Sequence, residues 1–319
     1  MRLQHTRSLD VQETKPVLAI SLTKVGAIGI KMPIGFVSFD NKPVTVVPTF
    51  NVFVDLPANQ KGIHASRNYE AISETLSPYV AKTYKLENLC ASVATELLRR
   101  HAYATRSEVE GQGEAIFERR APKTGMASYE SCNIMAKASA RRMPGGEISV
   151  RKTVGVGVTG ITACPCAQEI LREKSRSGIA KDKRLRKGMV DRVLARIPVA
   201  THMQRTYGTV TMDVPDGSDV DAMRLVHVIE DSMSASTFEL LKRPDEGEIV
   251  SMAVSRPRFA EDTIRYMMKN MIKSFPELSD DIMLTFTARS RESIHKHDFF
   301  AQRSITMGEI RHELKRLAR

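Results

Sequence analysis

Hydrophobic and polar residues alternate along several stretches of this chain, which is the pattern of β-strands with one buried face. β-branched residues are frequent in these stretches and favour the pleated conformation of a strand. The stretches predicted as strands are residues 17–34, 49–55, 104–119, 127–140, 147–161, 208–214 and 281–288.

Other stretches place apolar residues three and four positions apart, which predicts amphipathic helices. The clearest is 87–100, and 219–233 and 261–275 follow the same spacing. Pro276 ends the last of these, and its methionines are interpreted as core residues rather than as a ligand surface. A helix-like segment begins near Glu169, and 308–319 predicts a short basic terminal helix.

The order of these elements predicts two halves of similar plan. Met143-Pro144-Gly145-Gly146 is the best turn signal between them, which gives domains 1–146 and 147–319. A second strong turn signal, Pro215-Asp216-Gly217-Ser218, lies within the second half. Each half runs strand, strand, two helices, strand, strand, so the predicted class is α+β with antiparallel sheets.

The composition of the 319 residues, 42% hydrophobic and 27% charged, is that of a globular protein with a sizeable core. No apolar run is long enough to span a bilayer, and the polar N-terminus does not resemble a signal peptide. Four cysteines are too few for a disulfide scaffold and fit a reducing compartment. We therefore expect a cytoplasmic protein.

The formal charge of +11 suggests an anionic partner, either nucleic acid or a phosphorylated small molecule. The excess is concentrated in the basic insertion 172–196, where ten Lys and Arg residues face three acids. This insertion either attracts an anion or is a solvated segment without such a role. The absence of tryptophan and the 6% aromatic content argue against recognition by base stacking.

Candidate chemistry is concentrated at Cys164-Pro165-Cys166, which follows a predicted strand. Histidine and carboxylate residues recur downstream at His202, at Asp245-Glu246 and between Glu292 and His295. Thiolate, imidazole and carboxylate together suit a borderline divalent metal that keeps one position open for water. Two nearby thiols can also be simply buried, so this pattern alone leaves both interpretations open.

Six ordered motifs resemble those of the type IB GTP cyclohydrolases and their archaeal relatives. They begin at Lys61-Gly62-Ile63-His64-Ala65-Ser66-Arg67 and extend over nearly the whole chain. The other five are Ala163-Cys164-Pro165-Cys166, His202-Met203-Gln204-Arg205, Lys242-Arg243-Pro244-Asp245-Glu246, Pro257-Arg258-Phe259-Ala260-Glu261-Asp262 and Glu292-Ser293-Ile294-His295-Lys296-His297-Asp298.

Two features are similar to the archaeal branch, GTP cyclohydrolase IV of methanopterin biosynthesis. The basic insertion separates Cys164 from His202, and the motif reads His-Met-Gln-Arg where the bacterial enzymes have His-Asn-Gln-Arg. The segment Leu98-Arg99-Arg100-His101-Ala102-Tyr103-Ala104 also resembles the archaeal form. The departures, Ala65 and Ala27, touch no expected ligand.

The resemblance implies the tunnelling fold (T-fold), in which each half has an antiparallel four-stranded sheet and two helices and the subunits assemble into an oligomeric barrel. It also implies a homo-oligomer, a dimer or tetramer, with active sites at subunit interfaces.

The resemblance further implies a role for each matching residue. A metal would be held by Cys164, His202 and Glu246, with Cys164 also counted among the catalytic residues. Glu261 would accept two hydrogen bonds from a guanine ring. Glu292 and His295 would transfer protons. The triphosphate would be contacted by Lys61, His64 and Arg67. Cys166 and His297 would contact the residues of the site rather than the metal or the substrate.

The implied reaction is hydrolytic: a metal-activated water attacks C8 of GTP, the imidazole ring opens and formate leaves. The archaeal branch implies 7,8-dihydroneopterin 2′,3′-cyclic phosphate plus pyrophosphate, and favours Fe(II) over Mn(II) or Zn(II). The alternative is a type IB enzyme that gives 7,8-dihydroneopterin triphosphate for folate or modified-base synthesis. A basic nucleic-acid-binding protein is the alternative from a different class, and only the charge excess supports it.

Overall fold

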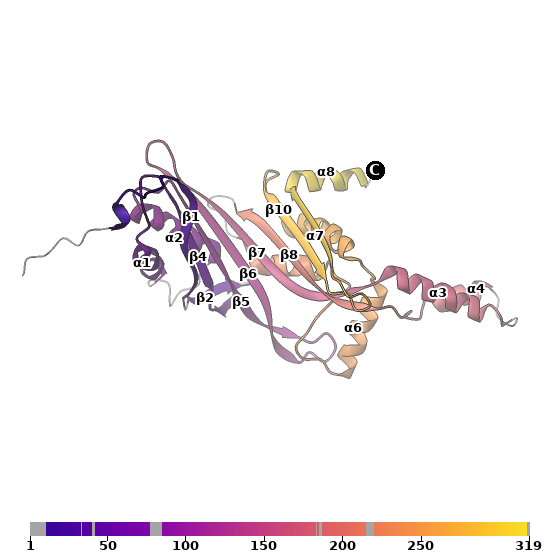
Figure 1. The fold of residues 1–319 in the computed structure, drawn as a ribbon. Coiled ribbons are helices and arrows are strands. Elements are labelled where there is room, and N and C mark those ends of the chain that lie inside the picture. The colour runs from indigo at the N-terminus through magenta and orange to yellow at the C-terminus, as the bar shows by residue number, and fades with distance from the viewer. Residues whose placement is uncertain are drawn as a thin grey trace, which may run out of the picture. The chain divides into compact units, whose positions relative to one another are not determined.

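The computed structural model describes residues 11–32, 34–39, 42–76, 85–182, 184, 187–214 and 220–317 (Figure 1). The turn predicted at 215–218 lies outside these residues.

Most strands belong to one nine-stranded sheet. Its order is β1 (Leu22–Lys31), β4 (Thr49–Leu56), β5 (Arg106–Arg120), β6 (Ala127–Arg142), β7 (Ile148–Ala163), β8 (Met203–Val214), β10 (Met283–Ser290) and β11 (Phe299–Thr306). The ninth strand, β9 (Ala235–Ser236), pairs with β7, while β2 (Ile34–Phe39) and β3 (Lys42–Val46) form a separate hairpin. The pairs β1–β4, β4–β5, β8–β10 and β10–β11 are antiparallel.

The predicted architecture, a tunnelling fold whose two halves each have their own four-stranded sheet, is corrected by this topology. The chain divides into two compact units, but β5, β6 and β7 each contribute residues to both. These strands are 15 or 16 residues long, about 50 Å at 3.3 Å per residue, which is enough to serve two cores. The sequence predicted that these strands are long, but it did not predict that each of them contributes residues to both units.

Met143–Gly146 forms the turn between β6 and β7. The amide of Met143 donates to the carbonyl of Glu147, and Gly145 and Gly146 have φ angles of 104° and 89°. These angles favour glycine, since a Cβ atom is strained there. The predicted boundary between 146 and 147 falls in this turn, and the division into domains 1–146 and 147–319 stays a prediction.

The first unit comprises 1–114, 135–154 and 214–219, and its core lies between β4 and α2 (Leu86–Arg100). Alternate residues of β4 are buried, and α2 buries Leu89, Val93 and Leu97 along one stripe. The predicted helix 87–100 is confirmed. A second helix, α1 (Ala65–Leu76), packs against α2, and the short 3₁₀ helix Val11–Glu13 precedes β1.

The second unit comprises 115–134, 155–213 and 220–319, and it contains α5 (Ala222–Glu230), α6 (Arg243–Ser255), α7 (Ala260–Ser274) and α8 (Met307–Leu317). α7 packs on β10 and β11, and its Met267 and Met271 are fully buried, as expected for core methionines. Gly208 of β8 allows this close packing, because a Cβ atom would lie 2.7 Å from Cε of Met267. Even-numbered residues of β8 from Thr206 onward and of β10 are buried, whereas odd-numbered ones such as Thr209 and Thr287 form a polar, less buried face.

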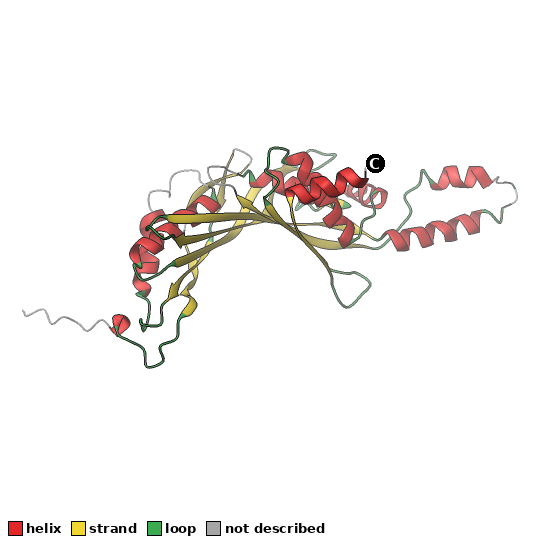
Figure 2. Ribbon diagram, turned by 90° about the horizontal axis from the view of Figure 1, so that it is seen from above, coloured by secondary structure: helices red, strands yellow, loops and turns green. Residues whose placement is uncertain are grey.

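The basic insertion includes the second half of α3 (Pro165–Ile179) and all of α4 (Lys187–Leu194), and these two helices lie side by side (Figure 2). Its three acids pair with arginines of the same insertion. Arg176 contacts Glu173 at 2.5 Å and Asp191 at 3.0 Å, and Arg184 contacts Asp182 at 2.6 Å. Most of its positive charge therefore has no acid of the insertion to neutralise it. No described helix is both long and apolar enough to cross a membrane.

Candidate active site

Cys164 lies between the end of β7 and the start of α3. Its Sγ accepts a hydrogen bond from the amide of Ala167 at 3.5 Å, so the thiol acts as the N-cap of α3. Proline at the first helical position, Pro165, is compatible with a helix start because that amide needs no partner. α3 therefore begins four residues before the predicted Glu169, which leaves Cys164 only 9% exposed and Cys166 exposed on the first turn.

His202 lies beside Cys164, although 37 residues separate them in the sequence. The amide of Cys164 donates to the carbonyl of His202 at 3.1 Å, and the hydroxyl of Thr201 donates to the carbonyl of Cys164 at 2.6 Å. β8 begins at Met203 rather than at the predicted Gly208, so His202 immediately precedes a strand. The structure thus brings the backbones of two of the three predicted metal ligands together, one on each side of the insertion.

The imidazole of His202 is oriented by hydrogen bonds at Nδ1. Nδ1 lies 3.0 Å from Oε1 of Gln204 and 3.4 Å from Oγ of Ser293. Because an amide oxygen only accepts, the proton of a neutral His202 is on Nδ1, which leaves the lone pair on Nε2. Gln204 therefore presents Nε2 as a potential metal ligand, a role that the sequence analysis missed although Gln204 lies in the His-Met-Gln-Arg motif.

Asp245 and Glu246 are placed very differently. Asp245 is fully buried and accepts hydrogen bonds from the amides of Lys123 and Thr124, from the Thr124 hydroxyl, and from the amide of Lys242. Burial opposes its ionisation, but these hydrogen bonds outweigh burial and lower the pKa of Asp245 to about 2. Glu246, the predicted ligand, is exposed on the first turn of α6.

Arg258 fixes the segment that leads into α7 beside the cysteine motif. Its amide donates to the carbonyl of Ala163 at 2.9 Å. Its guanidinium donates to the carbonyls of Asp231 and Met233 and lies 3.7 Å from the ring centroid of Tyr266. Burial lowers the pKa of Arg258. No role for Arg258 was expected from the sequence, although an arginine next to Pro257 in a family motif was a usable signal.

Glu261 lies on the first turn of α7 and is exposed. It lines a cavity of about 460 Å³ between α7, β11 and α8, whose wall includes the apolar side chains of Ile264, Met268 and Leu314. The lining also includes Arg265, Arg303 and Glu313, so the cavity combines apolar walls with charged groups, and the carboxylate of Glu261 can accept hydrogen bonds from a base that carries adjacent N–H donors.

The predicted proton-transfer residues lie between β10 and β11. Oε1 of Glu292 accepts from the hydroxyl of Ser290 at 2.7 Å. The rings of His295 and His297 stack at 5.4 Å between centroids, and Phe299 packs edge-on against both. Ser293 connects this segment to His202, so the proton-transfer motif approaches the Cys164–His202 pair.

Lys61, His64 and Arg67 belong to the first unit, at the start of α1. The amide of Lys61 donates to the carbonyl of Thr14, Nε2 of His64 lies 3.6 Å from Oε1 of Glu13, and Arg67 donates to the carbonyl of Arg100.

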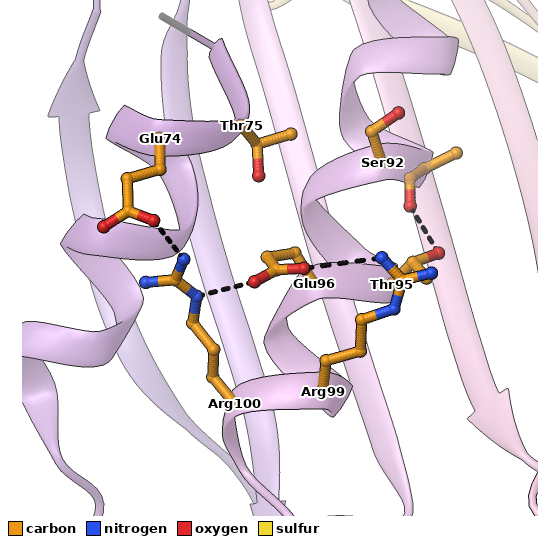
Figure 3. A pocket seen from close by; sticks show the side chains of 8 residues that line it. Glu74, Thr75, Ser92, Thr95, Glu96, Arg99 and Arg100 are labelled. Carbon is orange, nitrogen blue, oxygen red and sulfur yellow. Dashed lines mark hydrogen bonds and ion pairs between the residues drawn. The ribbon is translucent and has the colours of Figure 1, made fainter.

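Two groups of contacts hold α1 against α2: ion pairs of Arg100 near the surface, and hydrogen bonds of the buried His101. Arg100 of α2 pairs with Glu74 of α1 and with Glu96 of its own helix (Figure 3). It also pairs with Glu70 of α1. The neighbouring His101 is fully buried, and its ring lies 2.9 Å from Oδ1 of Asn68 and 2.8 Å from the hydroxyl of Tyr103. Burial, reinforced by the charges of Arg67, His64 and Arg100, lowers the pKa of His101 to about 4.

The thiol of Cys164 and the imidazole of His202 fit a borderline divalent metal in their chemistry. Within the described residues, however, no three or more His, Cys, Asp and Glu side chains form a group that could hold a metal ion. Glu246 is thus not brought into one group with the other two predicted ligands.

Residues 9–301 match the family described as type I GTP cyclohydrolase folE2, and the chain belongs to this family. It is 41% identical over 318 residues to the GTP cyclohydrolase MptA of Methanococcoides burtonii, which covers 99% of each chain. It is 42% identical to that of Methanococcus aeolicus, over 96% of this chain and 99% of the relative. These archaeal relatives confirm the resemblance that the motifs indicated.

Similar solved structures are urate oxidases. The uricase from Bacillus fastidious has a TM-score of 0.54 at 10% identity, covering 92% of this chain and 96% of that one. The uricase from Arthrobacter globiformis has a TM-score of 0.51 at 11% identity with the same coverage. At this identity the likeness concerns the fold alone, so the fold of the chain is that of the urate oxidases and replaces the predicted fold class.

Proposed function

We propose that this chain is a GTP cyclohydrolase that opens the imidazole ring of GTP, releases formate and forms 7,8-dihydroneopterin 2′,3′-cyclic phosphate with loss of pyrophosphate. Its membership of a GTP cyclohydrolase family makes GTP the substrate. The observation that carries the proposal is the 41% identity to an archaeal GTP cyclohydrolase MptA over 99% of both chains.

The metal in this proposal is Fe(II), held by Cys164 and His202 with Glu246 as the third ligand. When bound, such an ion supplies a Lewis acid that lowers the pKa of a water molecule. Gln204 supports this role, since its Oε1 lies 3.0 Å from Nδ1 of His202 and leaves Nε2 as the ring nitrogen for a ligand bond. Glu246 remains a predicted ligand whose place in the set rests on the family motif.

The other residues bind the base and move protons. The carboxylate of Glu261 accepts hydrogen bonds from N1–H and the 2-amino group of guanine, and the apolar wall of its cavity supports the flat ring. Oε1 of Glu292 is held by Ser290, which leaves Oε2 to exchange a proton with the substrate, and His295 is the second proton-transfer group. Lys61, His64 and Arg67 contribute donors for phosphate oxygens.

The enzyme works as a homo-oligomer with sites at subunit interfaces in this proposal. The absence of a three-ligand group within the described residues of one copy is compatible with a site that a second copy completes.

The test is an anaerobic assay of metal-stripped protein with GTP, to which Fe(II), Mn(II) or Zn(II) is added in turn. Mass spectrometry of the product distinguishes the cyclic phosphate from 7,8-dihydroneopterin triphosphate. We expect Fe(II) to restore formate release and the cyclic phosphate to form. Full activity without any metal would refute the metal assignment, and a triphosphate product would refute the archaeal reaction.

Cys164→Ala and Cys166→Ala form a matched pair, because both replace a thiol by a methyl group two residues apart. Only Cys164→Ala is expected to lose bound metal and GTP turnover. Normal metal content in that variant would remove Cys164 from the ligand set.

A further inference from the structure

We propose that Arg205, Arg289 and Arg291 form a subsite for the triphosphate group on the polar face of the second unit's sheet. The proposal rests on the proposed function and deepens it, since it names the residues that recognise the charged end of GTP. These arginines are distinct from Lys61, His64 and Arg67, which lie in the first unit.

The strand register brings the three arginines to one face. Tyr207 of β8 pairs with Arg289 of β10, and Thr206 pairs with Ser290. The amide of Arg291 donates to the carbonyl of Arg205 at 2.9 Å, which continues the same register by one position. Because side chains alternate between faces, Arg205, Arg289 and Arg291 project on the side opposite the buried Thr206 and Ser290.

These side chains line a real concavity. Thr159 of β7, Tyr207 and the three arginines enclose a cavity of about 290 Å³. Gly157 makes room for Tyr207, because a Cβ atom at that position would lie 1.9 Å from the Tyr207 hydroxyl. This hydroxyl accepts from the amide nitrogen of Asn133 at 3.1 Å, so its own hydrogen can be donated to a ligand.

The cavity carries an excess of positive charge. Arg289 is held by Asp298 through an ion pair of 2.8 Å. Arg205 and Arg291 are exposed, and neither has a carboxylate partner within the described part of the chain. Guanidinium groups that converge without neutralising acids attract a ligand with several negative charges and acceptor oxygens, which describes a polyphosphate.

The position of the cavity favours a nucleoside triphosphate over an unrelated anion. Arg205 follows His202 by three residues, and Ser293, which contacts His202, follows Arg291 by two. The cavity and the Cys164–His202 pair are thus connected through the same ends of β8 and β10. An acidic surface of a second copy of this chain is the competing ligand, and the experiment separates the two.

The experiment measures binding of inorganic tripolyphosphate by isothermal titration calorimetry, together with the kinetics of GTP turnover. Arg205→Gln and Arg291→Gln are compared with Arg316→Gln, which removes the same charge from an exposed site on α8. We expect each of the first two variants to weaken tripolyphosphate binding and to raise the KM for GTP by about ten- to a hundredfold, the effect of losing a charge-assisted hydrogen bond. The control variant should match the parent in both measurements.

Unchanged tripolyphosphate affinity in both variants would overturn the inference. A change in native mass without a change in tripolyphosphate affinity would also overturn it, since the arginines would then face another copy. If the parent binds tripolyphosphate through these arginines but does not turn over GTP, the subsite stands and the proposed function fails. If GTP is turned over normally by both variants, the proposed function stands and the subsite fails.

Discussion

Adjacent carboxylates in this chain have opposite environments. Asp245 is buried and accepts four hydrogen bonds, three of them from Lys123 and Thr124 in the turn between β5 and β6. Glu246 is exposed one residue later. Asp245 therefore holds α6 against this turn, and Glu246 is available for ligand binding.

Asp245→Asn should lower the melting temperature by several degrees, because an amide nitrogen would face donors that now bind a carboxylate oxygen. The pKa of about 2 lies below the ordinary value of 3.8, so the stabilisation from Asp245 is complete above pH 3.8 and is lost as the pH falls toward 2. Thermal melts of metal-free protein across this range test both points. Glu246→Gln is the control and should melt like the parent; equal melting of both variants would contradict the structural role of Asp245.

The sequence indicated which residues are candidates for the site, but it did not indicate which contacts these residues make in the folded chain. Cys164, His202 and Glu261 followed from ordered motifs, which record chemistry directly. The roles of Gln204 and Arg258 depend on where a ring nitrogen or a guanidinium points after folding, which residue order does not encode. The same limit applies to Arg205 and Arg291, whose proximity is set by the pairing of β8 with β10.

Glu261→Gln should weaken guanine recognition, because an amide can accept through only one of its two terminal atoms. We expect the KM for GTP to rise by about ten- to a hundredfold. Glu313→Gln is a matched control, since Glu313 lines the same cavity but pairs with Arg303 at 2.6 Å. An equal effect of both variants would assign Glu261 only the favourable interaction of an acid with a helix N-terminus.

Among the elements, those with strong periodicity were predicted well. Helices 87–100 and 261–275 correspond to α2 and α7 within one residue at each end. α1, α6 and β11 were missed: α6 has no pronounced apolar face, and β11 is largely exposed on both sides. Their formation depends on tertiary contacts such as those of Asp245 and of Arg100, which a local pattern does not contain.

The buried contact between α1 and α2 should make the first unit sensitive to mild acid. His101 has a pKa near 4 in the folded chain and about 6.5 when unfolded, so the unfolded state binds the proton more readily. The free energy of unfolding should therefore fall by about 2 kcal/mol between pH 6.5 and 4, somewhat less than full linkage because solvent screens part of the surrounding charge. Urea denaturation of the parent and of His101→Gln tests this, with His312→Gln, an exposed histidine of α8, as the control. A pH dependence that persists unchanged in His101→Gln would place the acid sensitivity elsewhere.

The basic insertion should act on the capture of substrate rather than on the chemical step. Its acids are already paired within the insertion, and its two ends meet at Cys164 and His202. If its excess cations attract GTP, kcat/KM falls steeply as the ionic strength rises. Replacing Lys183, Arg184, Arg186 and Lys187 by serine should flatten this dependence and leave metal content unchanged. A double replacement of Lys315 and Arg316 by serine on α8 is the control, and a salt profile of the quadruple variant equal to that of the parent would show that the insertion is a solvated segment.

At the scale of the whole molecule, we propose a homo-oligomer whose sites combine residues of two copies. Two variants that each have low GTP turnover at a GTP concentration below the KM of the parent should then complement one another when their subunits mix. Cys164→Ala retains a normal Glu261, and Glu261→Ala retains a normal Cys164. If the metal and guanine contacts of one site come from different copies, random mixing restores about a quarter of the sites. The measurement is GTP turnover after the two variants are dissociated together and reassembled, with each variant treated alone as the control. Failure to regain activity, although the mixed oligomer forms at normal mass, would place Cys164 and Glu261 of the same copy in each site.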